Sequence, residues 1–254
     1  NREQFSVEPD ASQIRPPLGS LVGFQVGSFP NFNLENDRSF DAFLPKVSLK
    51  YDWTDKISTA FTVQRGYRAG GAGTDIATGQ VFQFDPEFTW NYEAAFRGQF
   101  LDDRLTVNAN VFYLDWTDQQ VSVRTVSPIN PALQGGQTVN AGKSKVYGGE
   151  LTIDALPLPQ LEVFAGLGYA KSEFTQFNLN GQDLSGNRFG EPEWTAAVGG
   201  TYYFDNGLSL RADASYTGSS FSDVQNTNRI GDRFLVNAQI AYEYEEFLVF
   251  IGDL

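Results

Sequence analysis

Short turns and long loops alternate along this chain, and each short turn lies between segments in which apolar and polar residues alternate. The short turns fall at residues 54–56, 102–103, 157–160, 205–207 and 245–246. The long segments, rich in Gly, Asn, Asp and Ser, fall at 69–88, 126–139, 175–191 and 217–231. Tight turns at one end of the strands and long loops at the other are typical of an outer-membrane β-barrel, whose short turns face the periplasm.

The segments between the turns alternate with a period of two. In residues 47–53 the two faces are Val47, Leu49, Tyr51 and Trp53 against Ser48, Lys50 and Asp52. The pattern recurs at 57–64, 90–100, 105–113, 150–154, 161–169, 194–202, 208–216 and 234–243. A period of two predicts strands. Many exceed the usual five or six residues of globular sheets and approach the roughly 9–11 that a tilted strand needs to cross a bilayer. We expect nine or ten strands in an all-β, antiparallel transmembrane β-barrel meander.

Aromatic side chains gather near both ends of the predicted strands. Those near the short turns are Tyr51, Trp53, Phe100, Tyr202, Tyr203, Phe204, Tyr242, Tyr244 and Phe247. Those near the long loops are Tyr67, Trp90, Tyr92, Tyr113, Trp116, Tyr147, Trp194 and Tyr216. Two such belts suit the two membrane interfaces. The alternative is a soluble β-sandwich or barrel with these aromatics in its core. The polar faces, made of Ser, Thr, Asn, Gln and charges, favour a water-filled interior.

Composition excludes several classes of function. The net charge of −13 argues against nucleic acid as a partner, because a phosphate-binding surface needs a basic stripe. The chain has no His and no Cys, so Ser-His and Cys-His nucleophiles and disulfides are impossible. The acidic pairs at 102–103 and 245–246 lie in turns, and the segment 178–183 lacks the spacing of a calcium loop. We therefore expect no enzymatic activity, no catalytic residue, no cofactor and no metal site.

No segment of the sequence suits a transmembrane helix, and the longest apolar run is 247–251. A mean hydropathy of −0.31 is compatible with a barrel, because polar interior residues dilute the residues that face lipid. The sequence contains no Met, so we expect a fragment or a processed chain.

A series of short motifs follows one order between residues 45 and 254. They are Arg-Gly-Tyr-Arg-Ala-Gly-Gly at 65–71, Phe-Asp-Pro-Glu at 84–87, Asn-Tyr-Glu at 91–93, Phe-Leu-Asp-Asp-Arg-Leu at 100–105, Asn-Val-Phe-Tyr-Leu-Asp-Trp at 110–116, Asp-Gln-Gln at 118–120, Asn-Ala-Gly-Lys at 140–143, Tyr-Gly-Gly-Glu-Leu at 147–151 and Glu-Pro-Glu-Trp-Thr at 191–195. In order and spacing this series resembles the C-terminal half of the barrel of TonB-dependent outer-membrane receptors.

The resemblance implies a 22-stranded barrel in the bacterial outer membrane, in contact with its lipid and closed by an N-terminal plug. It implies import of a scarce small-molecule nutrient, such as a ferric siderophore, haem, cobalamin or a glycan, with energy from the TonB complex reached through an N-terminal box. We expect the plug and the box to be absent from these residues, and because residues 247–254 resemble the penultimate strand, we expect the closing strand to be absent too. Residues 1–254 are then one partial barrel domain. Its first 38 residues are irregular, with a strand near 21–26, and the piece is not expected to transport alone.

Ligand contacts are expected at the long loops and the outer part of the interior. The candidate substrate-binding residues are Arg65, Tyr67, Arg68, Asn91 and Trp116. The two arginines suit an anionic ligand through charge-assisted hydrogen bonds, although the many carboxylates of the interior favour a charge-balancing role for them instead. Glu93 and Arg97 are expected in a ladder of charges on the interior face. Two other functions stay open: a passive outer-membrane channel, and a soluble or surface β-protein that binds a partner through its loops.

Overall fold

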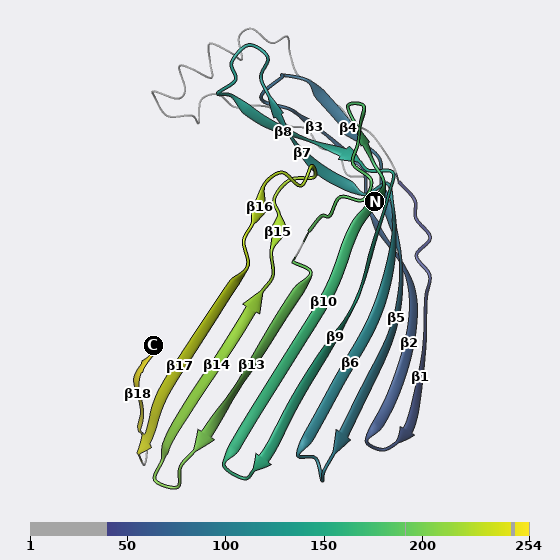
Figure 1. The fold of residues 1–254 in the computed structure, drawn as a ribbon. Coiled ribbons are helices and arrows are strands. Elements are labelled where there is room, and N and C mark those ends of the chain that lie inside the picture. Colours follow the sequence, from purple (N-terminus) through teal and green to yellow (C-terminus); the bar gives the residue numbers. More distant parts are fainter. Residues whose placement is uncertain (1–39, 191, 245–246, 254) are drawn as a thin grey trace. The chain divides into compact units, whose positions relative to one another are not determined.

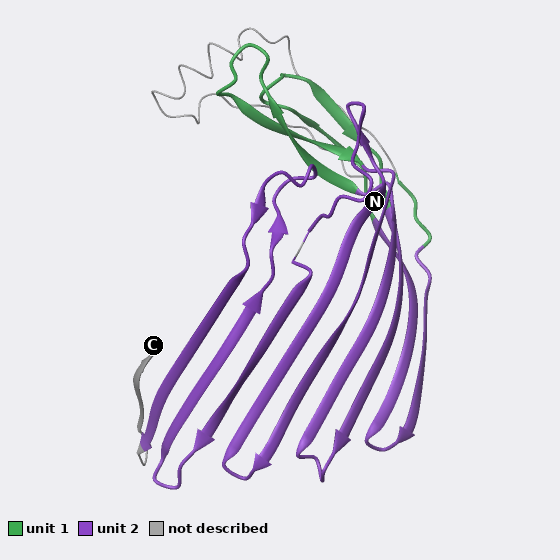
Figure 2. Ribbon diagram, viewed as in Figure 1, with its two compact units in different colours: residues 1–43, 68–87, 120–140 green, residues 44–67, 88–119, 141–254 purple. Residues whose placement is uncertain are grey.

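A computed structural model describes residues 40–190, 192–244 and 247–253 (Figure 1). The strand expected near 21–26 and the turn at 245–246 lie outside these ranges. The regular structure is eighteen β-strands. No helix within the described ranges combines the length and the apolar character needed to cross a membrane. The chain divides into two compact units (Figure 2): unit 1 comprises residues 1–43, 68–87 and 120–140, and unit 2 comprises 44–67, 88–119 and 141–254.

Ten long strands form one antiparallel sheet in the order β1-β2-β5-β6-β9-β10-β13-β14-β17-β18. Their bounds are β1 Lys46–Thr54, β2 Ile57–Arg68, β5 Glu87–Phe100, β6 Leu105–Thr117, β9 Lys143–Leu158, β10 Leu161–Gln176, β13 Trp194–Tyr203, β14 Leu208–Thr217, β17 Arg233–Tyr244 and β18 Phe247–Asp253. The expected all-β antiparallel barrel meander of nine or ten strands is therefore confirmed. Among the described strands, β1 and β18 are the edges of this sheet.

The register gives the sheet one apolar and one polar face. Between β6 and β9, Val107 pairs with Ile153 and Ala109 with Leu151, whereas Asn108 pairs with Thr152 one residue along. The next strand continues the apolar row, because Leu151 pairs with Leu167 of β10. A slip of one residue would exchange the two faces, so the alternation in the sequence specifies this register.

The apolar face is not covered by protein. Val47 is 71% exposed, Leu49 72%, Val111 61% and Phe234 65%. The buried hydrophobic residues lie elsewhere, in the segments next to the long loops: Ala77, Val121, Val123, Ala141, Phe174, Phe177 and Leu184. An exposed apolar surface that extends over a whole sheet is not stable in water, and it suits a hydrocarbon environment.

The short turns confirm the expected positions wherever the structure describes them. The turn after β5 holds Leu101, Asp102 and Asp103 at φ of 56°, 55° and 66°. Three successive left-handed residues are costly for L-amino acids, although Asp tolerates this region better than most. The backbone amide and the Nε of Arg104 both donate to the carbonyl of Leu101, at 3.3 and 3.1 Å, and so stabilise the turn.

The long segments differ from expectation, because each contains a β-hairpin. The pairs are β3 Gly71–Thr74 with β4 Val81–Phe84, β7 Gln120–Val126 with β8 Gln134–Asn140, β11 Asn178–Leu179 with β12 Gln182–Asp183, and β15 Ser220–Phe221 with β16 Arg229–Ile230. Gly, Asn and Ser are depleted in strands, so composition alone favoured loops there. Backbone pairing between nearby segments outweighs this weak preference.

Gly207 offers a test of how tightly the β13–β14 turn is built. Its φ is +85°, and an added Cβ would collide with the carbonyl oxygen of Glu243 on β17. We expect Gly207→Ala to lower the free energy of unfolding by about 1 kcal/mol for the backbone strain and by roughly 1–3 kcal/mol more for the collision. Gly181→Ala is the matched control, since Gly181 has the same φ of +85° but open space around it. Urea unfolding of the whole protein in detergent, followed by tryptophan fluorescence, measures both. Equal losses would show that the close approach to β17 does not matter.

Candidate functional site

The polar face of the sheet carries a network of hydrogen bonds between neighbouring strands. Asn108 Nδ2 donates to Thr152 Oγ1 at 3.4 Å, and Asn110 Nδ2 donates to Glu150 Oε2 at 3.3 Å. On the other side of the sheet's centre, Asn237 Nδ2 donates to Asp213 Oδ2 at 2.9 Å. Glu93 and Arg97 line the same small hollow as Asn108, Asn110 and Glu150. Polar side chains therefore line this face, which suits contact with water or with a polar partner. The ladder of charges expected at Glu93 and Arg97 stays a prediction.

An aromatic cluster lies on this face at the long-loop end. Trp116 of β6 packs edge-on against Phe189, with ring centroids 6.1 Å apart, and Phe189 lies 4.7 Å from Phe174 of β10. Phe174 is fully buried, and only 1% of the surface of Leu184 is exposed. The indole nitrogen of Trp116 is buried and has no hydrogen-bond acceptor among the residues that the structure describes. This nitrogen is therefore a donor that a ligand or a water molecule can satisfy.

Two buried serines hold the strands and the loop beneath this cluster. Ser144 Oγ donates to Gln119 Oε1 at 2.5 Å, and the Ser144 side chain is fully buried. Ser172 Oγ donates to the carbonyl oxygen of Phe189, and it accepts from the amide of Phe189 at 3.3 Å. The loop that carries Phe189 is thus fixed to β10 by hydrogen bonds as well as by ring packing.

A second set of contacts joins the 177–190 loop to the 218–230 loop. The amide of Arg188 donates to Asn226 Oδ1 at 2.8 Å, and Asn226 Nδ2 donates back to the carbonyl of Arg188 at 2.8 Å. Asn187 Nδ2 donates to the carbonyl of Val224 at 2.9 Å. The Arg188 guanidinium lies 3.2 Å from Glu193 and 5.7 Å above the ring of Phe221. The side-chain amide of Asn226 bonds both the amide and the carbonyl of Arg188, as the backbone of a neighbouring strand would. These two loops therefore form one hydrogen-bonded unit.

Asp223 organises the second of these loops. Its Oδ2 accepts from the hydroxyl of Thr227 at 2.7 Å and from the amide of Thr227 at 3.0 Å, and its Oδ1 accepts from the amide of Asn228 at 2.7 Å. Partial burial acts to raise the pKa of this carboxyl, but the hydrogen bonds from Thr227 and Asn228 outweigh it and hold the pKa below its usual value. The charged form therefore stabilises the loop.

Unit 1 has its own polar centre around Glu87. Arg68 Nε lies 2.8 Å from Glu87 Oε1, and the amide of Gln120 donates to Glu87 Oε2 at 2.6 Å. The side chain of Gln120 in turn donates to the carbonyls of Ala69 at 2.8 Å and Asp85 at 3.0 Å. These bonds hold together the segments that lead into and out of the β3–β4 and β7–β8 hairpins. Arg68 therefore has a structural partner, Glu87, whose residue surface is only 5% exposed.

The five residues predicted to bind substrate do not share one surface. Tyr92 and Tyr113 pair on the apolar face. Asn91 is one residue from Tyr92 and Trp116 is three residues from Tyr113, so both lie on the polar face. Arg65 lies on the same face as the apolar residues of β2, and its guanidinium lies 4.5 Å above the ring of Phe88. Tyr67 also packs on Phe88, at 5.3 Å.

The residues that sequence reasoning missed are Phe174, Phe189, Arg188 and Asn226. Phe189, Arg188 and Asn226 lie in segments read only as long loops, and the Asn226–Arg188 contact spans 38 residues. The sequence offers only a weak signal for these residues, which is that Phe189 is an aromatic residue with polar residues and glycines around it. Within the described ranges, no three His, Cys, Asp or Glu side chains are arranged to hold a metal ion.

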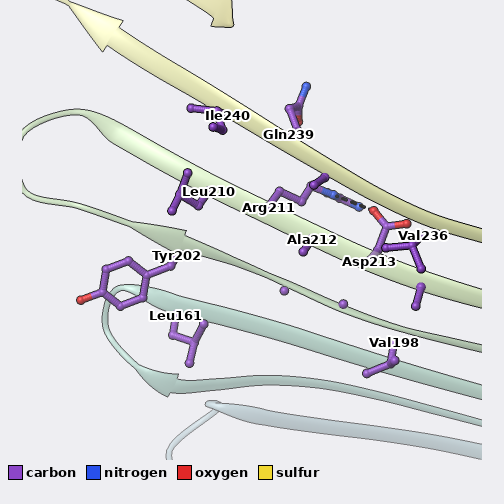
Figure 3. A pocket seen from close by; sticks show the side chains of 14 residues that line it. Leu161, Val198, Tyr202, Leu210, Arg211, Ala212, Asp213, Val236, Gln239 and Ile240 are labelled. Carbon is purple, nitrogen blue, oxygen red and sulfur yellow. Dashed lines mark ion pairs between the residues drawn. The ribbon is translucent and has the colours of Figure 1, made fainter. Parts of the chain in front are cut away.

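A hollow of about 660 Å³ lies elsewhere. Figure 3 shows Leu161, Val198, Tyr202, Leu210, Val236 and Ile240 around it, and the Arg211–Asp213 ion pair beside it. The six residues belong to the apolar rows of β10, β13, β14 and β17. The hollow is thus a shallow depression in the apolar face, which suits an acyl chain better than a polar ligand.

Comparison with known proteins gives a consistent result. A sequence model of the TonB-dependent receptor-like β-barrel family matches residues 22–250. The chain is 28% identical over 187 residues to the metal-pseudopaline receptor CntO of Pseudomonas aeruginosa, covering 72% of this chain and 24% of that protein. It is 24% identical over 227 residues to the probable TonB-dependent siderophore receptor PiuA of Acinetobacter baumannii, covering 83% of this chain and 29% of that protein.

Solved structures share the fold. The ferric yersiniabactin uptake receptor FyuA of Yersinia pestis matches with a TM-score of 0.62 and 24% identity, over 78% of this chain and 29% of that one. The siderophore receptor PiuA of Acinetobacter baumannii matches with a TM-score of 0.62 and 23% identity, over 79% and 29%. The chain spans 24–29% of the length of the curated relatives named above.

The joined loops give a test with two separate readouts. Asn226→Ala removes both bonds to Arg188, so we expect amide hydrogen exchange to rise roughly thirtyfold in residues 184–190 and in 219–229, since each such bond contributes about 1 kcal/mol. Asn178→Ala is the control, because the Asn178 side chain accepts from the amide of Gly181 in its own turn. Faster exchange confined to residues 219–229 would show that the two loops are independent.

The Asp223 loop should depend on pH. Because the folded pKa lies below the unfolded one, the stabilisation is complete above the unfolded value of about 3.9 and is lost as pH falls through the folded pKa. We expect protection of the amides of Thr227 and Asn228 to be constant at about pH 5–7 and to fall below about pH 4. Hydrogen exchange corrected for intrinsic rates measures this. Asp223→Asn should abolish the pH dependence, and a transition that persists in that variant would assign it to another group.

Proposed function

This chain belongs to the TonB-dependent receptor-like β-barrel family, and we propose that the protein carrying it is an outer-membrane receptor that imports a ferric siderophore or a similar metal chelate with energy from TonB. The observation that carries the proposal is the division of the sheet into an uncovered apolar face and a hydrogen-bonded polar face. In a barrel these faces meet lipid and a wet interior. The long loops then face outward and the short turns face the periplasm.

The substrate class is proposed from the relatives. CntO is named a receptor for metal-pseudopaline and PiuA a probable siderophore receptor, and FyuA takes up ferric yersiniabactin. These ligands are metal chelates. An organic chelate offers polar groups and flat surfaces, which amide and aromatic side chains recognise. Asn91 and Trp116 of the polar face supply such groups in this chain.

We propose that the ligand contacts this chain at the long-loop end of the polar face. The aromatic cluster of Trp116, Phe174 and Phe189 gives that end a buried support. The joined loops hold Arg188 and Asn226 beside it. A site whose loops are fixed before binding loses less conformational entropy when the ligand arrives. Arg65, Tyr67 and Arg68 are weaker candidates, because their side chains already have aromatic or carboxylate partners.

Uptake in cells tests the proposal. Cells that express the full-length protein should accumulate iron from at least one of a panel of hydroxamate, catecholate and carboxylate siderophores, and deletion of TonB should abolish that uptake. Uptake that continues without TonB would instead indicate a passive channel. A protein with no affinity for membranes would indicate a soluble or surface β-protein.

Paired variants test the site. We expect Asn91→Ala and Trp116→Ala to weaken binding of the accepted chelate to the purified receptor by about tenfold each, the loss of roughly one good contact. Trp194→Ala is the control, because Trp194 lies on the apolar face against Tyr169. Titration of intrinsic fluorescence with the chelate measures all three. Equal affinities in the Asn91, Trp116 and Trp194 variants would place the ligand elsewhere.

A further inference from the structure

A row of aromatic rings crosses the apolar face near the long-loop end. Tyr92, Tyr113 and Tyr147 follow one another across β5, β6 and β9, and Tyr169 pairs with Trp194 across β10 and β13. From Tyr169 to Leu161, β10 rises about 26 Å, or about 20 Å along the membrane normal at a tilt near 40°. This height approaches the apolar band of about 25 Å in outer-membrane barrels. The aromatic row therefore marks one membrane interface.

The residues just beyond this row are charged. Lys145 of β9 pairs with Glu173 of β10 on one side and with Asp115 of β6 on the other. Lys171 pairs with Tyr147. In each strand the alternation that places Leu151 and Leu167 on the apolar face continues to these residues. Their side chains therefore lie on the apolar side of the sheet and not on its polar face. Lys143, two residues further along β9, is also on this side and is exposed.

The lysines converge on one carboxylate. Lys145 Nζ lies 2.8 Å from Glu173 Oε1, and Lys171 Nζ lies 3.3 Å from Glu173 Oε2. The Lys145 side chain is 31% exposed and the Lys171 side chain 34%. Each ammonium has three donors, and one carboxylate cannot accept them all. Ion pairs this exposed contribute little to stability, so structural need does not account for the cluster.

We propose that Lys145 and Lys171, with Lys143 beside them, bind the phosphate of a lipid headgroup in the outer leaflet. Three lysines face two carboxylates here, so the patch is positive although the chain carries a net charge of −13. Its position next to the aromatic row is the level of the headgroups. A phosphate accepts charge-assisted hydrogen bonds from both ammonium groups. The proposal rests on the proposed function, because it requires that the chain spans the membrane with its long loops outward.

The test compares a phosphorylated lipid with its dephosphorylated form. The full-length protein in uncharged detergent is titrated with bis-phosphorylated lipid A, with lipid A from which both phosphates have been removed, and with inorganic phosphate, and bound lipid is counted by native mass spectrometry. We expect the wild type to prefer the phosphorylated lipid by at least about tenfold, since each lysine near a lipid surface contributes a factor of roughly five. Inorganic phosphate should compete only weakly, because it lacks the acyl chains.

Two variants with opposite effects separate binding from a structural role. Lys145→Gln with Lys171→Gln should remove the preference for phosphate. Glu173→Gln should increase it, because both ammonium groups lose their internal partner. A control double variant, Lys50→Gln with Lys56→Gln, removes the same charge from lysines that also have carboxylate partners, on the polar face and in a short turn. It should leave the preference unchanged.

Each other outcome overturns one specific claim. Equal binding of both lipids by the wild type overturns the phosphate site while leaving the membrane barrel in place. Loss of preference in Glu173→Gln as well as in the double lysine variant would mean that the cluster only stabilises the strands. Strong competition by inorganic phosphate would make the site one for a free anion. No binding of either lipid, with no heat-dependent gel mobility, would overturn the proposed membrane function itself.

Discussion

Backbone hydrogen bonding between neighbouring strands is the constraint on which the rest of this structure depends. Packing of side chains within the protein cannot hold the ten-stranded sheet, because its apolar residues, such as Leu49 and Phe234, are mostly exposed. In hydrocarbon, a strand must satisfy its amides and carbonyls with its neighbours. The antiparallel register does this from β1 to β18. Once the register is fixed, the face on which every side chain lies is fixed as well.

Conventional packing is confined to the segments next to the long loops. Most of the buried hydrophobic residues of the described structure belong to the hairpins of unit 1 or to the cluster around Phe174 and Leu184, and Ala141 lies between β8 and β9. These segments therefore fold as small globular proteins do, by burying apolar surface and joining polar groups, as Asn226 and Arg188 do. The two parts of the chain therefore differ in how they treat apolar side chains: the strands expose them on one face, whereas the segments next to the long loops bury them.

The sequence predicted the strands well because a period of two is a direct consequence of strand geometry. The same parity could have sorted the candidate site. Arg65 and Tyr67 are an even number of residues from Phe61 and share its face, whereas Asn91 and Trp116 are an odd number of residues from Tyr92 and Tyr113 and lie on the opposite face. Charge and aromatic character alone do not show which face of a strand a residue occupies. The contact between Asn226 and Arg188 could not be predicted from the sequence, because no local pattern specifies which two loops meet.

Adjacent residues in one strand can thus serve unrelated purposes without interfering. Asp115 lies in the charged row outside the sheet, whereas Trp116, the next residue, packs under a loop on the polar face. Similarly, Lys171 and Glu173 face outward, and Ser172 between them fixes Phe189. Because the sheet separates the two faces, a substitution on one side need not disturb a contact on the other. The proposed lipid contact and the proposed ligand contact can therefore change independently along the same strand.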